Sequence, residues 1–217
     1  MSKYKCIIFD CDGVLVDSEP ISIQILVDMA NGYGANIDLA YGMKHFKGSF
    51  FDACKNKIAQ LTNRPIPDSF QEDYRKQSFE AFKKNMQPVK GVKNVLTNLN
   101  LPFCVASSGP EDKIRLNLGL AGLLPYFENK IFSCYTINKW KPDPAVFLWA
   151  AETMGFKPNE CLVIEDSLSG VRAANAGGFD VFGFTAHDYN DELKNEATKT
   201  FDSMDGLLEM IYVSSYT

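Results

Sequence analysis

The chain has 217 residues, a length typical of one ordinary domain that carries a smaller second module. Hydrophobic residues make up 46% of it and charged residues 23%, which excludes a disordered or fibrous protein. The formal charge of −5 repels phosphate backbones and anionic lipids, so we expect neither nucleic acid nor a membrane as a partner. An anionic substrate would need a local positive feature for its capture.

The sequence contains no segment that resembles a membrane span or a secretory signal. Its longest apolar run covers residues 145–151, whereas a span needs roughly 20 residues. Near the N-terminus only residues 6–9 form an apolar run before Asp10 interrupts it. The six cysteines include no C-x-x-C pair, and we expect them to be buried thiols in a reducing compartment. We therefore expect a cytoplasmic protein that is a monomer or a weak dimer.

Short apolar runs that are typical of buried parallel strands recur along the chain. They cover residues 4–9, 103–107, 131–134, 161–165 and 180–184. Helical patterns lie between most of them, among them residues 143–154 and 168–176. This alternation predicts an α/β protein with a doubly wound, Rossmann-like parallel sheet. Residues 188–200 are expected to form a surface loop or a frayed helix, and residues 213–217 a loose end.

One long stretch after the first strand contains helical sequence and no convincing strand. An amphipathic helix is predicted from about residue 20 to residue 31, where Gly32 and Gly34 close it, and helical sequence continues to Met86. Residues 87–91 have the composition of a return hinge. We therefore expect an α/β core of residues 1–15 and 89–217, with a small all-α cap of residues 16–88 inserted into it.

Polar residues follow directly after the predicted strands. In open parallel sheets ligands bind outside the carboxyl ends of the strands, so these residues are the candidates for a site. Taken singly, each could be a strand terminator, a helix cap or a solvated charge. Such structural roles do not explain all of these residues together, because the carboxylates among them would repel one another. Like charges about 4 Å apart repel by on the order of 4 kcal/mol per pair. The candidates are Asp10, Asp12, Ser107, Ser108, Gly109, Lys141, Glu165 and Asp166.

Four crowded carboxylates and one lysine indicate a divalent cation. Mg²⁺ prefers hard oxygen ligands, commonly one or two carboxylates together with a substrate phosphate. The spacing of Asp10 and Asp12 turns both carboxylates toward one pocket, because alternate residues of an extended segment point the same way. One of them can remain ionised as nucleophile and metal ligand, while the other acts as general acid and then base.

Attack by a carboxylate on phosphorus gives an aspartyl-phosphate and divides hydrolysis into two easier steps. Ser107 and the amides at the start of the helix that follows Pro110 can hold phosphate oxygens. Lys141 adds a fixed positive charge for the transfer. The residues therefore fit phosphoryl transfer to an aspartate.

Four sequence motifs occur in order on the predicted strand ends. Read along the chain they are Asp10-x-Asp12-Gly13, Ser107 after an apolar strand, Lys141-Pro142, and Glu165-Asp166 with its glycine and alanine pattern. Together they resemble the motifs of the haloacid dehalogenase superfamily over residues 6–178. The helical insertion resembles the helical cap of the subgroup that contains phosphoglycolate phosphatase and β-phosphoglucomutase.

The resemblance implies a role for each motif residue. Asp10 would be the nucleophile and a metal ligand, and Asp12 the acid/base residue and a ligand through its backbone carbonyl. Ser107 and Lys141 would hold phosphate. Asp166 would be the remaining metal carboxylate, with Glu165 in support, and the cofactor would be Mg²⁺.

Departures from relatives narrow the expected activity. Asp12 disfavours halide displacement, because dehalogenases of the superfamily lack this second aspartate. Ser22 and Phe51 stand where β-phosphoglucomutase has a histidine and an arginine, which weakens a mutase reading. Segments 46–48, 74–75, 107–110 and 140–144 resemble those of sugar-phosphate phosphatases such as the 6-phosphogluconate phosphatases.

The cap is expected to select the substrate. Its segment 44–51 combines basic residues with a glycine and two phenylalanines, which suits a small polar anion between apolar walls, although a solvated basic turn also fits. Our hypothesis is that Lys47 or Arg75 contacts a second anionic group of the substrate. We expect Gly48 of the cap, with Ser108 and Gly109 of the core, to line the same substrate.

The sequence therefore predicts a Mg²⁺-dependent phosphatase that hydrolyses a small phosphorylated metabolite, a sugar or sugar-acid phosphate, through an aspartyl-phosphate. One alternative is a phosphosugar mutase like β-phosphoglucomutase. A second is a non-catalytic phosphometabolite-binding protein, which the fold alone does not exclude.

Overall fold

The computed structural model describes residues 2–47, 49, 51–188 and 191–213. None of the helices among these residues has both the length and the apolarity to span a bilayer. The strands are β1 (Cys6–Phe9), β2 (Phe103–Ser107), β3 (Ile131–Ser133), β4 (Cys161–Glu165), β5 (Asp180–Phe184) and β6 (Lys199–Phe201). The α-helices are α1 (Glu19–Gly32), α2 (Leu39–Phe46), α3 (Phe51–Thr62), α4 (Phe70–Asn85), α5 (Val92–Asn98), α6 (Glu111–Leu120), α7 (Cys134–Ile137), α8 (Ala145–Met154), α9 (Leu168–Ala176) and α10 (Leu207–Val213).

The chain divides into two compact units. One contains the residues up to Val16 and those from Pro88 onward, and the other runs from Asp17 to Gln87. Val16 and Pro88 therefore lie one residue beyond the limits expected for the core. The physical reason is that Val16 forms isolated β-bridges with Asp12 and with Pro88. These bridges attach to the core both the segment that leaves it and the segment that returns to it.

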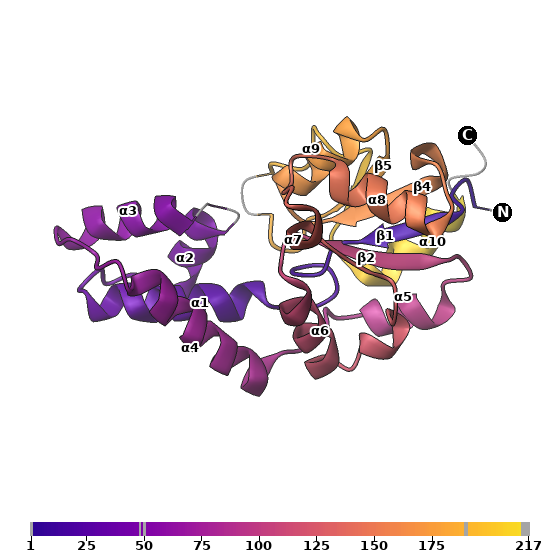
Figure 1. Cartoon of the computed structure of the whole chain (residues 1–217). Coiled ribbons are helices and arrows are strands. Elements are labelled where there is room, and N and C mark those ends of the chain that lie inside the picture. The colour runs from indigo at the N-terminus through magenta and orange to yellow at the C-terminus, as the bar shows by residue number, and fades with distance from the viewer. Residues whose placement is uncertain (1, 48, 50, 189–190, 214–217) are drawn as a thin grey trace. The chain divides into compact units, whose positions relative to one another are not determined.

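The core unit is built on a parallel sheet with the strand order β3-β2-β1-β4-β5-β6. Helices α1–α4 lie between β1 and β2 in the chain, and Figure 1 shows them in indigo to magenta. The doubly wound α/β fold with a helical insertion is thus confirmed. The strands β1 to β3 follow one another toward one edge of the sheet and β4 to β6 toward the other, so the switch point lies between β1 and β4. Ligands of such sheets bind in the crevice at the carboxyl ends of the strands beside this point. The ends of β1 and β4 therefore mark the expected site.

The sheet is buried on both faces, as its apolar strands predict. Cys6 and Ile8 of β1 point into a cluster that contains Val146 and Phe147 of α8 and Val171 of α9, so α8 and α9 cover this face. Figure 1 shows α5 and α6 on the other side of the sheet. All six cysteines are buried as free thiols.

Two elements of the core differ from expectation. Residues 188–200 were expected to be a loop or frayed helix, but Lys199–Phe201 forms the edge strand β6, and α10 follows it. Both are short, and an edge strand with one buried residue carries little of the alternation that identifies a strand. Val213 ends α10, and the rest of the expected loose end lies outside the described residues.

The second unit contains α1–α4 around an apolar core of its own. Ile23 and Val27 of α1 pack with Met43 and Phe46 of α2, and Ile58 of α3 belongs to the same cluster. The buried residues of α1 recur three and four positions apart, which is the spacing of one helix face.

Close packing of α1 against α2 requires glycine at position 42. A Cβ built there would lie 2.6 Å from Val27 Cγ2 and 2.7 Å from Ile23 Cγ2. We expect Gly42→Ala to lower the free energy of unfolding by about 1–3 kcal/mol through overpacking. Gly32→Ala is the matched control, because a Cβ there meets no described atom within 4 Å. Thermal and urea unfolding of both variants would measure this, and equal stability would contradict the packing described.

Candidate active site

The predicted strand-end residues meet in the core unit around the ammonium group of Lys141. Lys141 Nζ donates to Asp10 Oδ1 at 2.5 Å, to Glu165 Oε1 at 2.6 Å and to the carbonyl of Ala106 at 3.2 Å. These acceptors come from the ends of β1, β4 and β2, which are adjacent strands. All three charged side chains are buried. The parallel sheet thus assembles one cation and two carboxylates from segments far apart in the sequence.

Asp166 approaches the segment that follows β1 because residue 13 is glycine. A Cβ at Gly13 would lie 2.3 Å from Asp166 Oδ2, so no other residue fits without displacing that carboxylate. Gly13 also has a φ of +83°, which L-residues rarely adopt. The glycine of the first motif therefore serves both the turn after Asp12 and the approach of Asp166.

Glu165 is held on both of its carboxylate oxygens. Oε1 accepts from Lys141, while Oε2 accepts from the backbone amide of Ser167 at 2.8 Å and from its hydroxyl at 2.9 Å. A Cβ at Gly170 would lie within 2 Å of Oε1, so this carboxylate lies directly against α9. Ser167 and Gly170 were not among the predicted site residues. Glu165 is thus arranged to hold Lys141.

Negative charge is in excess around Asp10. Burial raises the pKa of Asp10 well above its usual value, Lys141 opposes this, and Glu165 and Asp166 raise it further. Burial lowers the pKa of Lys141, but Asp10 and Glu165 outweigh it, so the pKa of Lys141 is raised and the ammonium stays charged. One ammonium therefore acts on Asp10 together with two carboxylates.

Two of the four carboxylates predicted to bind Mg²⁺ are directed to other partners in this arrangement, and two remain as candidate ligands. Within the described ranges, no three His, Cys, Asp or Glu side chains form a ready-made metal-binding group. Glu165 is committed to Lys141 and Ser167, and the carboxylate of Asp12 is directed to α6. Asp10 and Asp166 remain as side-chain candidates, and one or two carboxylates beside a phosphate are the usual protein share of a Mg²⁺ site.

Asp12 contacts two side chains that the sequence did not single out. Lys113 Nζ donates to Asp12 Oδ2 at 2.9 Å, and Asn117 Nδ2 donates to Asp12 Oδ1 at 3.2 Å. Both donors lie on α6, four residues apart and therefore on one helix face. The spacing of Lys113 and Asn117 could have indicated a shared partner, but it could not have identified Asp12.

The predicted phosphate-holding turn follows β2. Ser107 is buried, and its Oγ accepts from the amide of Gly109 at 3.1 Å, while the carbonyl of Gly109 accepts from Ser133 at 2.7 Å. Ser108 is exposed. The amide of Lys113 in the first turn of α6 donates to Asp112 Oδ1 at 2.8 Å. That amide is therefore occupied within the helix, while the expectation that the start of α6 holds phosphate oxygens through its amides stays a prediction.

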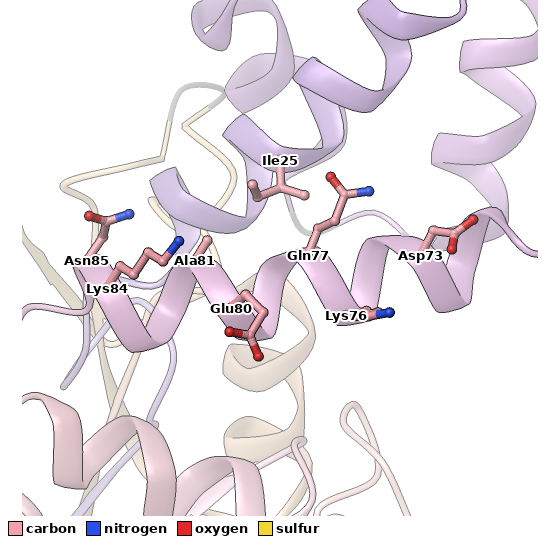
Figure 2. Close-up of a pocket in the computed structure, with 8 residues that line it drawn as sticks. All are labelled: Ile25, Asp73, Lys76, Gln77, Glu80, Ala81, Lys84 and Asn85. Atoms are coloured by element: carbon pink, nitrogen blue, oxygen red, sulfur yellow. The ribbon is translucent and has the colours of Figure 1, made fainter.

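The candidate substrate residues of the cap lie in the second unit. Lys47 follows the last turn of α2 and is half-buried, and Arg75 is exposed on α4. Gly48 lies outside the described residues. A depression of about 580 Å³ lies between α1 and α4 and is lined by Ile25 of α1 and by residues of α4. Figure 2 shows Ile25 above α4, nearest to Ala81 and Gln77. Neither Lys47 nor Arg75 lines it, so this depression is separate from the predicted substrate residues.

Comparisons with known proteins agree with this architecture. A family model described as haloacid dehalogenase-like hydrolase matches residues 4–178. The chain is 31% identical to 6-phosphogluconate phosphatase of Escherichia coli (strain K12), over 97% of this chain and 96% of that protein.

Two solved structures have the same fold over nearly their whole length. A haloacid dehalogenase-like protein of unknown function from Agrobacterium tumefaciens has a TM-score of 0.91 and 30% identity, covering 96% of this chain and 97% of its own. A HAD family hydrolase from Deinococcus radiodurans, solved with bound phosphate and sodium, has a TM-score of 0.81 and 26% identity, covering 95% and 94%.

The protein is thus a hydrolase with a doubly wound, Rossmann-like core, and its relatives include phosphatases. The chain belongs to the haloacid dehalogenase-like hydrolase family.

Lys141 is expected to contribute strongly to the free energy of unfolding, because it compensates the charge of the buried acids. Lys141→Met would leave Asp10 and Glu165 buried without their shared cation, and removal of one partner from such a group costs about 3–5 kcal/mol. Lys139→Met is the matched control, because Lys139 is exposed and its ion pair with Asp143 is long, at 3.8 Å. We expect this substitution to change the free energy of unfolding by no more than about 0.5 kcal/mol. Urea unfolding without divalent cations would measure both, and similar losses would contradict the geometry described.

Proposed function

We propose that this protein is a Mg²⁺-dependent phosphatase that removes phosphate from a small sugar or sugar-acid phosphate through a phosphoenzyme on Asp10. The observation that carries the proposal is the contact of Lys141 with both Asp10 and Glu165 at the ends of adjacent strands. The similarity over nearly the whole chain to a bacterial sugar-acid phosphatase supports the substrate class.

In the first step a carboxylate oxygen of Asp10 attacks phosphorus. Lys141 contacts Asp10 directly and supplies a fixed positive charge beside the transferred group. Ser107 and Gly109 form the turn that we assign to the phosphate oxygens. As the ester bond breaks, Asp12 gives its proton to the leaving oxygen, and phosphate becomes bonded to Asp10.

In the second step water hydrolyses the phosphoenzyme. Asp12, now ionised, accepts a proton from the water, which attacks phosphorus and releases Asp10. The same residue thus acts as acid and then as base, and Asp10 returns to its starting state. Glu165 keeps Lys141 in place throughout.

A bound Mg²⁺ supplies positive charge that lowers the repulsion between the carboxylates and the incoming phosphate. Asp10 and Asp166 would hold it with the backbone carbonyl of Asp12. The negative excess around Asp10 supports this assignment. Glu165 has an indirect part, because both of its oxygens already accept hydrogen bonds.

The cap residues Lys47 and Arg75 are proposed to contact a second anionic group of the substrate, together with Gly48. Such a contact would favour sugar-acid phosphates over neutral sugar phosphates. Lys47 follows the last turn of α2, and Arg75 lies on α4. Both carry a positive charge on a long side chain, which a contact with an anionic group requires.

Phosphate release is the direct test of the proposed function. We expect the wild type with Mg²⁺ to release phosphate from one or more members of a panel of sugar and sugar-acid phosphates, 6-phosphogluconate among them. Asp10→Asn should lose at least roughly 1,000-fold in kcat, because the attacking oxygen loses its charge. Asp143→Asn is the matched control, since Asp143 is half-buried near the surface and its Oδ1 caps α8.

The panel also separates the alternatives. Conversion of β-glucose 1-phosphate to glucose 6-phosphate without release of phosphate would identify a mutase. Binding of phosphorylated sugars without any turnover would indicate the non-catalytic alternative. Full activity of Asp10→Asn would exclude Asp10 as the nucleophile.

A further inference from the structure

The carboxylate of Asp12 is contacted on both oxygens by a single helix. Lys113 reaches Oδ2 and Asn117 reaches Oδ1, at 2.9 and 3.2 Å. Neither residue belongs to the four sequence motifs, and both are more than 100 positions away from Asp12 in the chain. Two donors on one face of α6 therefore fix how this carboxylate is oriented.

Asn117 is an unusual residue for its position in the core. It is 0% exposed, it lies between the buried residues Ile114 and Leu118 of α6, and its Oδ1 has no hydrogen-bond partner among the described residues. A buried carbonyl without a partner costs roughly 1–3 kcal/mol, and a leucine of similar size would avoid this loss. Packing does not explain the amide. Its hydrogen bond to Asp12 does.

The same carboxylate lies beside the turn assigned to the phosphate. A Cβ built on Gly109 would lie 3.6 Å from Ser107 Oγ, 3.7 Å from Lys113 Cδ and 3.9 Å from Asp12 Oδ2. These three side chains therefore surround one point of the turn. Lys113 lies in the first turn of α6 and is half-exposed, whereas Asn117, one turn further on, is fully buried.

We propose that Lys113 and Asn117 are positioning residues that orient Asp12 for proton transfer to the leaving group. This inference rests on the proposed function. When the ester P–O bond breaks, phosphorus bonds to Asp10 and the proton of Asp12 moves to the leaving oxygen, which leaves a negative charge on Asp12. Lys113 stabilises this new charge, and Asn117 keeps the carboxylate directed to the same place. Both contacts thus contribute more in the transition state than before it.

The dependence on the leaving group tests this role. An alkyl leaving group needs the proton of Asp12, whereas 4-nitrophenolate leaves without one, and kcat/KM reports the first transfer for both. For Lys113→Met and for Asn117→Leu we expect kcat/KM toward 6-phosphogluconate to fall roughly 10-fold or more, and toward 4-nitrophenyl phosphate by less than about threefold. Lys113→Arg should restore most of the loss.

A matched control comes from the same helix. Arg115→Met also removes one positive charge from α6, but Arg115 pairs with Glu111 at 2.8 Å and should leave kcat/KM for both esters unchanged. Asn117→Leu should have a melting temperature no lower than that of the wild type, because it removes the carbonyl that lacks a partner. A loss of activity in this variant is then not a loss of folding.

Equal losses for both esters, or no loss for either, would overturn the positioning role. The failure of the proposed function is distinguishable, because it would appear in the wild type as absence of phosphate release from both esters, or in Asp10→Asn as retained activity. If the wild type is active, Asp10→Asn is inactive and Lys113→Met treats both esters alike, only the inference about α6 is wrong.

Discussion

Repulsion between buried carboxylates is the constraint on which the rest of this structure depends. Asp10, Glu165 and Asp166 come from the ends of two adjacent strands, and Lys141 is the ammonium in contact with two of them. In water such charges would be weakly coupled, but burial strengthens their interaction several-fold. The core therefore has a place at the end of β1 where a further positive charge is favourable.

The fold creates this place through its strand order and through two glycines. Because β1 lies between β2 and β4, its end is flanked by the Ser107–Gly109 turn on one side and by Glu165 on the other. Gly13 and Gly170 leave room for the carboxylates of Asp166 and Glu165, where any side chain would collide. The close approach of the acids therefore depends on the two glycines, which have no side chain.

The strand-end residues were predictable from the sequence because apolar strands and the acids that follow them are local features. Asp10, Ser107 and Glu165 could be placed at one sheet edge by strand periodicity, whereas Lys141 lies beyond α7 and is not placed by it. The structure brings Lys141 to Asp10, to Glu165 and to the carbonyl of Ala106, the neighbour of Ser107. The contacts of α6 were not predictable in this way. Helix periodicity says which residues share a face, but not which carboxylate that face meets.

Other features could not be predicted from the sequence, for different physical reasons. Glu165 was expected near the metal, yet its hydrogen bonds to Lys141 and Ser167 depend on a backbone turn that no pattern reveals. The edge strand β6 has only one buried residue and so lacks a clear alternation. The cap residues Lys47 and Arg75 stay proposals, because their task depends on a ligand and not on the packing of their own unit.

We expect the acids at the end of β1 to form a divalent cation site. The most direct test of this expectation is a crystal grown with Mn²⁺ in place of Mg²⁺, in which the anomalous signal locates the ion. We expect one strong peak between the carboxylates of Asp10 and Asp166, next to the backbone carbonyl of Asp12. A well-ordered core with Mn²⁺ present and no peak at these residues would contradict it.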